Sequence, residues 1–140
     1  MMTPSRSNPM MAFGRVLLGL YFLLPGLFKL AAPAQQLALM EHHGVPFASP
    51  LLLVAGIVTV VGALFLMTNR YVRLTSLGFV LYILVINAML HDFWNFTGVE
   101  AQHETQNFVK NLGILAGLLV LAGASPWRAI RAKGLLKADD

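Results

Sequence analysis

Apolar residues run along the chain in four long stretches that are separated by short polar segments. The stretches cover about residues 12–32, 50–68, 72–90 and 108–124. A helix that crosses the hydrocarbon core of a bilayer needs about 20 consecutive, mostly apolar residues. The pattern therefore predicts an all-α fold, an integral membrane bundle of four transmembrane helices that forms a single domain over residues 1–140.

The amino-acid composition indicates that lipid, rather than water, surrounds these helices. Of the 140 residues, 57% are hydrophobic and 11% are charged, whereas about 25% of the residues in soluble domains are charged. Six acidic and ten basic residues are too few to cover a small soluble globule. The chain has no cysteine, so redox chemistry would need a bound cofactor or a partner protein.

Basic residues gather in three segments that lie on one side of the membrane if the chain crosses it four times. These are the N-terminus, the loop between the second and third stretches, and the C-terminal tail, with Arg6, Arg70, Arg73, Arg128, Arg131, Lys133 and Lys137. Because cytoplasmic segments are enriched in Lys and Arg, both termini are predicted to be cytoplasmic. The net charge of +4 is then a membrane-surface effect and does not indicate nucleic-acid binding.

A cleaved signal peptide that ends at Ala32-Pro33-Ala34 is an alternative for the first stretch. Cleavage would leave three spans with the same orientation, so the charge distribution does not distinguish the two interpretations. Lys29 within the apolar stretch favours a transmembrane helix.

Small residues recur at helical spacing in three of the stretches and predict close packing between helices. They are Gly19 and Gly26 in the first stretch, Ala55, Gly56, Thr59, Gly62 and Ala63 in the second, and Gly113 and Gly117 in the fourth. We expect all of them to pack within one bundle. Because Gly113 and Gly117 form a GxxxG motif, a seam between two copies of the chain is the alternative for that pair.

Two cationic residues interrupt the first stretch. Arg15 and Lys29 are fourteen residues apart, close to four helical turns, and so share one face. At 1.5 Å per residue they lie about 21 Å apart along the axis, Arg15 near the cytoplasmic boundary and Lys29 near the outer one. We expect Arg15 to snorkel to the headgroups. For Lys29, snorkelling and a position inside the bundle both stay open.

Polar residues also gather where the third and fourth stretches reach the outer side. Asn87 and His91 are four residues apart, Asn107 and Asn111 repeat this spacing, and Lys110 adjoins Asn111. The outer loops add Glu41, His42, His43, Asp92, His103 and Glu104. The candidate ligand-binding residues are therefore Lys29, Asn87, His91, Asn107, Lys110 and Asn111, with Arg15 as a polar residue at the cytoplasmic end.

Three kinds of chemistry could use these residues. In a structural interpretation, Asn87, His91 and the amides of the fourth stretch hydrogen-bond one another and lock the helix ends. In a binding interpretation, the apolar ring of a quinone or similar amphiphile sits between helices, and Lys, His and Asn reach its oxygens. A metal site is disfavoured, because Glu100-Ala-Gln-His103 is a single ExxH motif where di-iron bundles use two.

Five short segments, in order, resemble the DoxX family of small bacterial membrane proteins. They are Gly14-Arg15-Val-Leu-Leu-Gly19, Gly26-Leu-Phe-Lys29-Leu, Gly44-Val45-Pro46, Asn87 to Trp94 with His91, and Asn107-Phe108-Val-Lys110-Asn111-Leu112. The family often has a Glu early in the second span. This chain has Thr59 or a neighbour there, and no acidic residue in that span.

The resemblance implies a multi-pass protein of the bacterial inner membrane. Relatives are linked to quinone-dependent sulfur oxidation, terminal oxidase complexes and oxidative-stress defence with soluble redox partners. It thus implies a membrane subunit in a quinone-linked redox process, with quinone as a candidate cofactor and redox-complex subunits as partners. Whether the chain is itself an enzyme stays open. The alternative is a non-enzymatic scaffold or assembly partner; a transporter is disfavoured, because inverted repeats and acidic residues within the spans are lacking.

Overall fold

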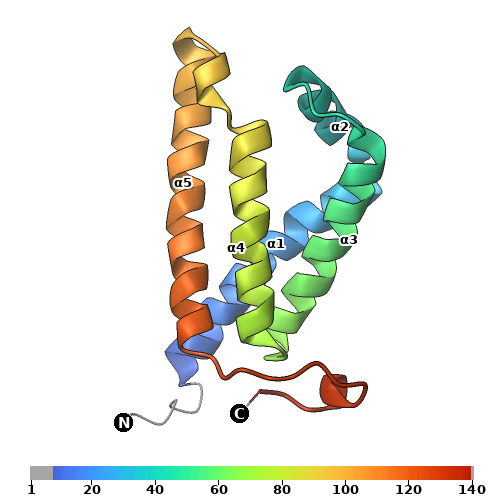
Figure 1. Cartoon of the computed structure of the whole chain (residues 1–140), viewed down its shortest axis with the longest axis vertical. Helices are drawn as coiled ribbons and strands as arrows, with labels where there is room; N and C mark the ends of the chain where they lie inside the picture. Colours follow the sequence, from blue (N-terminus) through green and yellow to red (C-terminus); the bar gives the residue numbers. More distant parts are fainter. Residues whose placement is uncertain (1–7, 140) are drawn as a thin grey trace.

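The computed structural model describes residues 8–139, so Arg6 lies outside the described residues. All regular structure in this range is helical (Figure 1). The elements are α1 (Pro9–Ala31), α2 (Pro33–His42), α3 (Ala48–Met67), α4 (Val72–Leu90), η1 (Phe93–Asn95), α5 (Gly98–Gly123) and η2 (Gly134–Leu136). Within residues 8–139, the four helices α1, α3, α4 and α5 are long and apolar enough to span a membrane. The predicted fold class is confirmed.

Prolines and a polar cap fix where the first two helices begin. The side-chain oxygen of Asn8 accepts a hydrogen bond from the backbone N–H of Met11 at 2.8 Å, and Pro9 opens α1. Pro33 opens α2 in the same way, since the missing N–H of a proline has no partner in a first turn. The residue before a proline is restricted away from the α region, and Ala32 has φ −140° and ψ 68°. The first span therefore ends at Ala31.

Two helical segments were not expected from the sequence. The segment after the first span was expected to be a loop but contains α2, and α5 begins at Gly98 rather than near residue 108. Both segments are too polar to be recognised as parts of a membrane span. They are nevertheless rich in Ala, Gln and Glu, which favour a helix. The α5 helix therefore extends beyond the apolar stretch by about three turns.

The four long helices form two antiparallel hairpins (Figure 1). α1 packs along α3, and α4 packs along α5, whereas the two hairpins contact each other less. Both ends of the described chain lie at one end of the bundle, here called the terminal end. The opposite end carries α2, η1 and the four histidines, and is called the histidine end. The cytoplasmic location of the terminal end stays a prediction.

Glycines allow α1 and α3 to approach closely, as their spacing predicts. A Cβ added at Gly26 would lie 2.5 Å from Thr59 Oγ1, and one at Gly56 would lie 2.7 Å from Leu30 Cδ2. Gly19 likewise has no room for a side chain, because Met67 covers it. The first hairpin is therefore held by backbone proximity, the usual way in which helices associate in lipid.

Gly113 and Gly117 differ from these glycines. A Cβ added at either position meets no atom within 4 Å in the described part of the chain. The expectation that this pair packs within the bundle is therefore wrong, because the GxxxG face of α5 points away from the other described helices. The seam between two copies of the chain stays a prediction for this face.

An aromatic stack joins the two hairpins near the middle of the bundle. The Phe22 ring of α1 lies on the Phe79 ring of α4, with centroids 3.9 Å apart and planes 6° from parallel. The Phe79 ring also covers Gly62 of α3. The same buried core continues toward the terminal end with Ala63, Leu66, Val72 and Leu118, and it includes Ile83 on the other side of the stack. The hairpins are thus joined by this core at the middle and below, and diverge toward the histidine end (Figure 1).

The C-terminal tail folds back over the terminal end (Figure 1). The Asp139 carboxylate accepts hydrogen bonds from the backbone N–H groups of Tyr71 and Val72, at 3.0 and 2.9 Å. Arg128 Nη1 donates to the same carboxylate at 2.8 Å, and its guanidinium lies over the Tyr71 ring. A residue at the far end of the chain therefore caps the first turn of α4.

Arg15 is buried at the terminal end and does not snorkel. Its residue is 8% exposed, and its Nε donates to the Leu66 carbonyl oxygen at 2.9 Å. The expectation of snorkelling is wrong. Carbonyl groups in the last turn of α3 lack donor partners within the helix, and one of them accepts a hydrogen bond from the guanidinium inside the protein. Arg15 thus ties α1 to the end of α3.

The close approach at Gly26 makes a testable prediction about stability. Gly26→Ala is expected to lower the free energy of unfolding by about 1–3 kcal/mol, because the new Cβ collides with Thr59 and with the backbone nitrogen of Val60. Gly78→Ala is the matched control, since Gly78 also lies inside a long helix and a Cβ there meets nothing within 4 Å. Unfolding by sodium dodecyl sulfate in mixed micelles measures both. Equal stability of the two variants would contradict the close helix contact.

Candidate functional site

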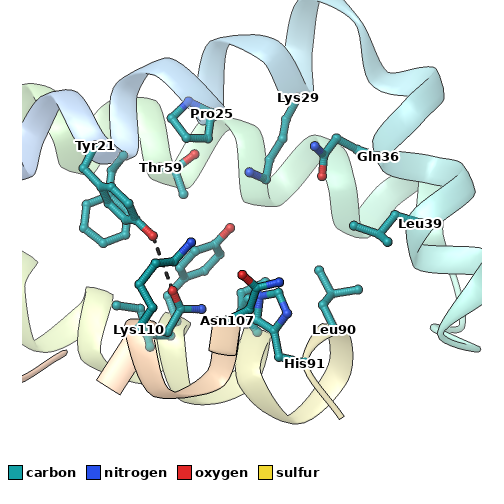
Figure 2. A pocket seen from close by; sticks show the side chains of 15 residues that line it. Tyr21, Pro25, Lys29, Gln36, Leu39, Thr59, Leu90, His91, Asn107 and Lys110 are labelled. Atoms are coloured by element: carbon teal, nitrogen blue, oxygen red, sulfur yellow. Dashed lines mark hydrogen bonds between the residues drawn. The ribbon is translucent and has the colours of Figure 1, made fainter. Parts of the chain in front are cut away.

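A cavity of about 370 Å³ lies between the two hairpins (Figure 2). Phe22 of the aromatic stack lines it, and Leu39, Leu90 and His91 extend its wall toward the histidine end. Residues from α1 to α5 contribute to its wall. Its apolar lining consists of Phe22, Pro25, Leu39, Ile83, Ile86 and Leu90. Ligand pockets in proteins are commonly about 300–1,000 Å³ and mostly apolar, with a few polar groups that fix orientation. The cavity has this size and character.

Polar groups converge on the cavity from both hairpins (Figure 2). Five of the six candidate binding residues lie in its wall: Lys29, His91, Asn107, Lys110 and Asn111. Lys29 comes from α1, His91 follows the end of α4, and the other three come from α5. The structure therefore brings together residues that are up to 82 positions apart in the sequence, from Lys29 to Asn111.

Asn87, the sixth candidate, lies behind the cavity wall rather than in it. Its Oδ1 accepts from Asn111 Nδ2 at 3.0 Å, and its own Nδ2 donates to the Phe108 carbonyl oxygen at 3.1 Å. Asn111 Oδ1 in turn accepts from the Tyr21 hydroxyl at 3.4 Å (Figure 2). Asn87 thus holds α4 against α5 and fixes the orientation of Asn111. For this pair the contacts agree with the structural interpretation, in which the side chains hydrogen-bond one another and lock the helix ends.

The two lysines of the wall face each other across the hairpins. Lys29 points into the cavity from α1, and Lys110 points into it from α5 (Figure 2). Neither ammonium group forms a salt bridge with an acidic side chain of residues 8–139. Among the described residues, none of those that line the cavity is acidic. The sequence left two positions open for the Lys29 side chain, inside the bundle or at the headgroups. In the structure the side chain lies inside the bundle.

A chain of histidines and carboxylates leads from the cavity to the histidine end. His91, in the cavity wall, has Nδ1 2.7 Å from Glu104 Oε2. The other Glu104 oxygen lies 3.8 Å from Nε2 of His43, whose Nδ1 is 2.6 Å from Asp92 Oδ1. Asn95 Nδ2 donates to the second Asp92 oxygen at 2.7 Å. Two histidine–carboxylate pairs, His91–Glu104 and His43–Asp92, therefore lie in sequence behind the cavity wall.

The arrangement of these titratable groups bears on metal binding. In the described residues, no group of three or more histidine, aspartate or glutamate side chains has an arrangement that would hold a metal ion. The His43 imidazole is 1% exposed, and its Nε2 has no hydrogen-bond partner in that range. Its two carboxylate neighbours are Asp92, 2.6 Å from Nδ1, and Glu104, 3.8 Å from Nε2.

Four polar wall residues were not predicted from the sequence. They are Tyr21, Gln36, Thr59 and Tyr82. Tyrosine and threonine are ordinary residues in membrane spans, and Gln36 lies in the unexpected helix α2, so nothing marked them in advance. Thr59 was noted as the residue near the place of the family's Glu. Its hydroxyl lines the cavity but donates to the carbonyl oxygens of Ala55 and Gly56, at 2.7 and 3.1 Å.

Comparison with protein families supports the resemblance seen in the sequence. The family model DoxX matches residues 10–92, more than half of the chain. No curated protein and no solved structure matched. The matched part extends from the start of α1 to Asp92 and includes Lys29 and His91, whereas the cavity residues of α5 lie beyond it. The similarity of the Asn107–Leu112 segment to the family therefore stays a prediction. The chain itself, by the extent of the match, belongs to the DoxX family.

Proposed function

We propose that the cavity binds a quinone and that the chain is a membrane subunit in a quinone-linked redox process of the bacterial inner membrane. The observation that carries this proposal is the convergence of hydrogen-bonding side chains over an apolar floor, within helices able to span a bilayer. A quinone has this two-sided character, because its ring is apolar and its oxygens accept hydrogen bonds. The cavity volume of about 370 Å³ accommodates a ring head group.

Each part of the wall has a role in this proposal. Lys29, Lys110 and the Asn107 amide donate to the quinone oxygens from the two hairpins, and Phe22 and Ile83 contact the ring. His91 holds a proton near one oxygen and exchanges it through Glu104. Reduction of a quinone to a quinol takes up two electrons and two protons. The electrons come from a partner subunit or soluble redox protein, while this chain binds the ring and conducts protons.

Quinone binding by the purified protein tests this assignment. His91→Ala and Lys29→Ala are each expected to weaken the binding of decylubiquinone about tenfold, since one hydrogen bond to a charged or polar group is worth about 1–2 kcal/mol. Isothermal titration calorimetry in a non-ionic detergent measures the affinity. His103→Ala and Lys133→Ala are the matched controls, because neither residue lines the cavity. Unchanged affinity in both cavity variants would overturn the assignment.

A scaffold or assembly role is the second candidate. The open face of α5 at Gly113 and Gly117 favours it, because small residues at this spacing suit close contact with another helix. The partner could be another subunit or a second copy of the chain. Stoichiometric co-purification of a partner that is lost in Gly113→Leu, together with a failure to bind quinone, would favour this role over the quinone role.

A further inference from the structure

The cavity wall carries positive charge on both sides and no negative charge. Lys29 lies on the α1 side and Lys110 on the α5 side, and His91 lines the cavity next to Leu90 (Figure 2). The Glu104 and Asp92 carboxylates behind His91 are each already paired with a histidine. A ligand in the cavity therefore meets two ammonium groups that the protein itself does not neutralise.

The two lysines differ in this respect from three arginines of the described protein. Arg15 donates to the Leu66 carbonyl oxygen, Arg70 donates to the carbonyl oxygens of Leu135 and Thr68, and Arg128 pairs with Asp139. These groups all find oxygen partners within the chain. Lys29 and Lys110 form no hydrogen bond or ion pair within residues 8–139, although they project into a cavity between membrane-spanning helices, where an unpaired charge is costly.

A neutral head group would leave this charge uncompensated. The carbonyl oxygen of a neutral quinone accepts a hydrogen bond from an ammonium group but brings no countercharge. An oxyanion does both, and attraction between opposite charges is stronger in a site of low dielectric than in water. The charge pattern of the cavity therefore favours a ligand with an oxyanion on an apolar body.

We propose that the cavity selects amphiphiles with an anionic oxygen head group, and that this head group bridges Lys29 of α1 and Lys110 of α5. The inference rests on the proposed function, because it specifies the ligand class of the same cavity. The oxyanion can belong to a ring, as in a hydroxyquinone, or to the carboxylate of a fatty acid. Both sources share the chemistry that the two lysines recognise.

The bridge has a mechanical consequence for the bundle. The hairpins are joined by the Phe22–Phe79 stack and the core below it, and they diverge on the side of the cavity. A head group held by one lysine from each hairpin adds a link at the diverging end. An anionic ligand therefore stabilises the bundle against unfolding more than a neutral ligand of the same shape, since stabilisation follows affinity for the folded state.

Two nearly isosteric naphthoquinones test the proposal. The hydroxyl of 2-hydroxy-1,4-naphthoquinone is ionised at pH 7.5, whereas 2-methoxy-1,4-naphthoquinone is neutral. We expect the wild-type protein in a non-ionic detergent to bind the hydroxy compound at least tenfold more tightly in calorimetric titration. The double variant Lys29→Met/Lys110→Met is expected to lose this preference and to bind the two naphthoquinones with affinities within about threefold of each other. Lys133→Met controls for the loss of a lysine outside the cavity.

A charge-preserving variant keeps the test decisive if the methionine variant fails to fold. Lys29→Arg/Lys110→Arg retains both cations and is expected to retain the preference for the hydroxy compound. Equal affinity of the wild-type protein for the two naphthoquinones overturns the inference and leaves quinone binding intact. A preference that persists in the folded methionine variant overturns the assignment to the two lysines. If neither naphthoquinone nor decylubiquinone binds, the proposed function fails as well.

A second pair of ligands identifies the source of the oxyanion. Oleate and methyl oleate differ in the charge of the head group alone. If oleate binds more tightly than both naphthoquinones, and methyl oleate does not, the anionic selectivity is supported while the quinone assignment is overturned. If the hydroxy compound binds more tightly than oleate, both the anionic selectivity and the ring head group are supported.

Discussion

Asp139→Ala is expected to lower the free energy of unfolding by about 3 kcal/mol, the size typical of removing one partner from a buried ion pair. The carboxylate is 2% exposed and accepts from two backbone N–H groups at the start of α4 as well as from Arg128. Its loss leaves the two backbone N–H groups without their acceptor and removes the ion pair of Arg128. The tail that covers the terminal end is then released, although no part of the cavity is touched.

Two comparisons make this prediction specific. Asp139→Asn keeps an oxygen acceptor but removes the charge, so we expect it to fall between wild type and Asp139→Ala. Glu41→Ala removes the charge of an exposed carboxylate and is expected to change stability by less than about 0.5 kcal/mol. Unfolding in mixed micelles gives the free energies, and proteolysis of the tail reports its release. If Asp139→Ala is as stable as Glu41→Ala, the cap at α4 does not contribute to the fold.

The membrane fold could be predicted from the sequence because hydropathy is a local property. Each of the four spans contains enough consecutive apolar residues to be recognised alone, and three of them both begin and end within three residues of the expected bounds. The start of α5 and all of α2 were not predicted, because their residues are polar and helical preference is weak evidence in short segments.

The contacts of Asp139 and Arg15 at the terminal end could not be predicted from the sequence, for a different reason. Asp139 contacts Tyr71, which lies 68 residues earlier, and no pattern of spacing connects them. The same limit explains Arg15, whose snorkelling was inferred from its place near a helix end. A carbonyl group at the end of α3 satisfies it instead, and only the packing of α1 on α3 reveals that partner.

The cavity was partly predictable because ionisable residues are rare in apolar stretches. Lys29, His91 and Lys110 stood out from their neighbours, and the structure brings them to one wall. Asn87 stood out equally but supports Asn111 from behind. The sequence marks polar residues that need partners, and it does not tell which of them find those partners within the protein.

The second large effect is expected at the histidine end. His43→Ala should lower the free energy of unfolding by about 3 kcal/mol, because the Asp92 carboxylate is 7% exposed and loses the imidazole 2.6 Å away. Glu104 then faces Asp92 without a histidine between them. His43 follows α2, whereas Asp92 follows α4, so the break also loosens the contact between the two hairpins next to the cavity.

The neighbouring His42 provides a matched control for this effect. Its Nε2 lies 2.6 Å from Glu100 Oε1, the same separation as in the His43–Asp92 pair, but the two side chains are 57% and 46% exposed. Exposed ion pairs contribute about 0–1 kcal/mol, so His42→Ala should be close to wild type. The double variant His43→Ala/Asp92→Asn should recover part of the loss, since the uncompensated charge is gone. Hydrogen exchange in α2 locates the change. Equal losses in His42→Ala and His43→Ala would show that burial does not strengthen the inner pair, and that the histidine–carboxylate chain does not hold the hairpins together.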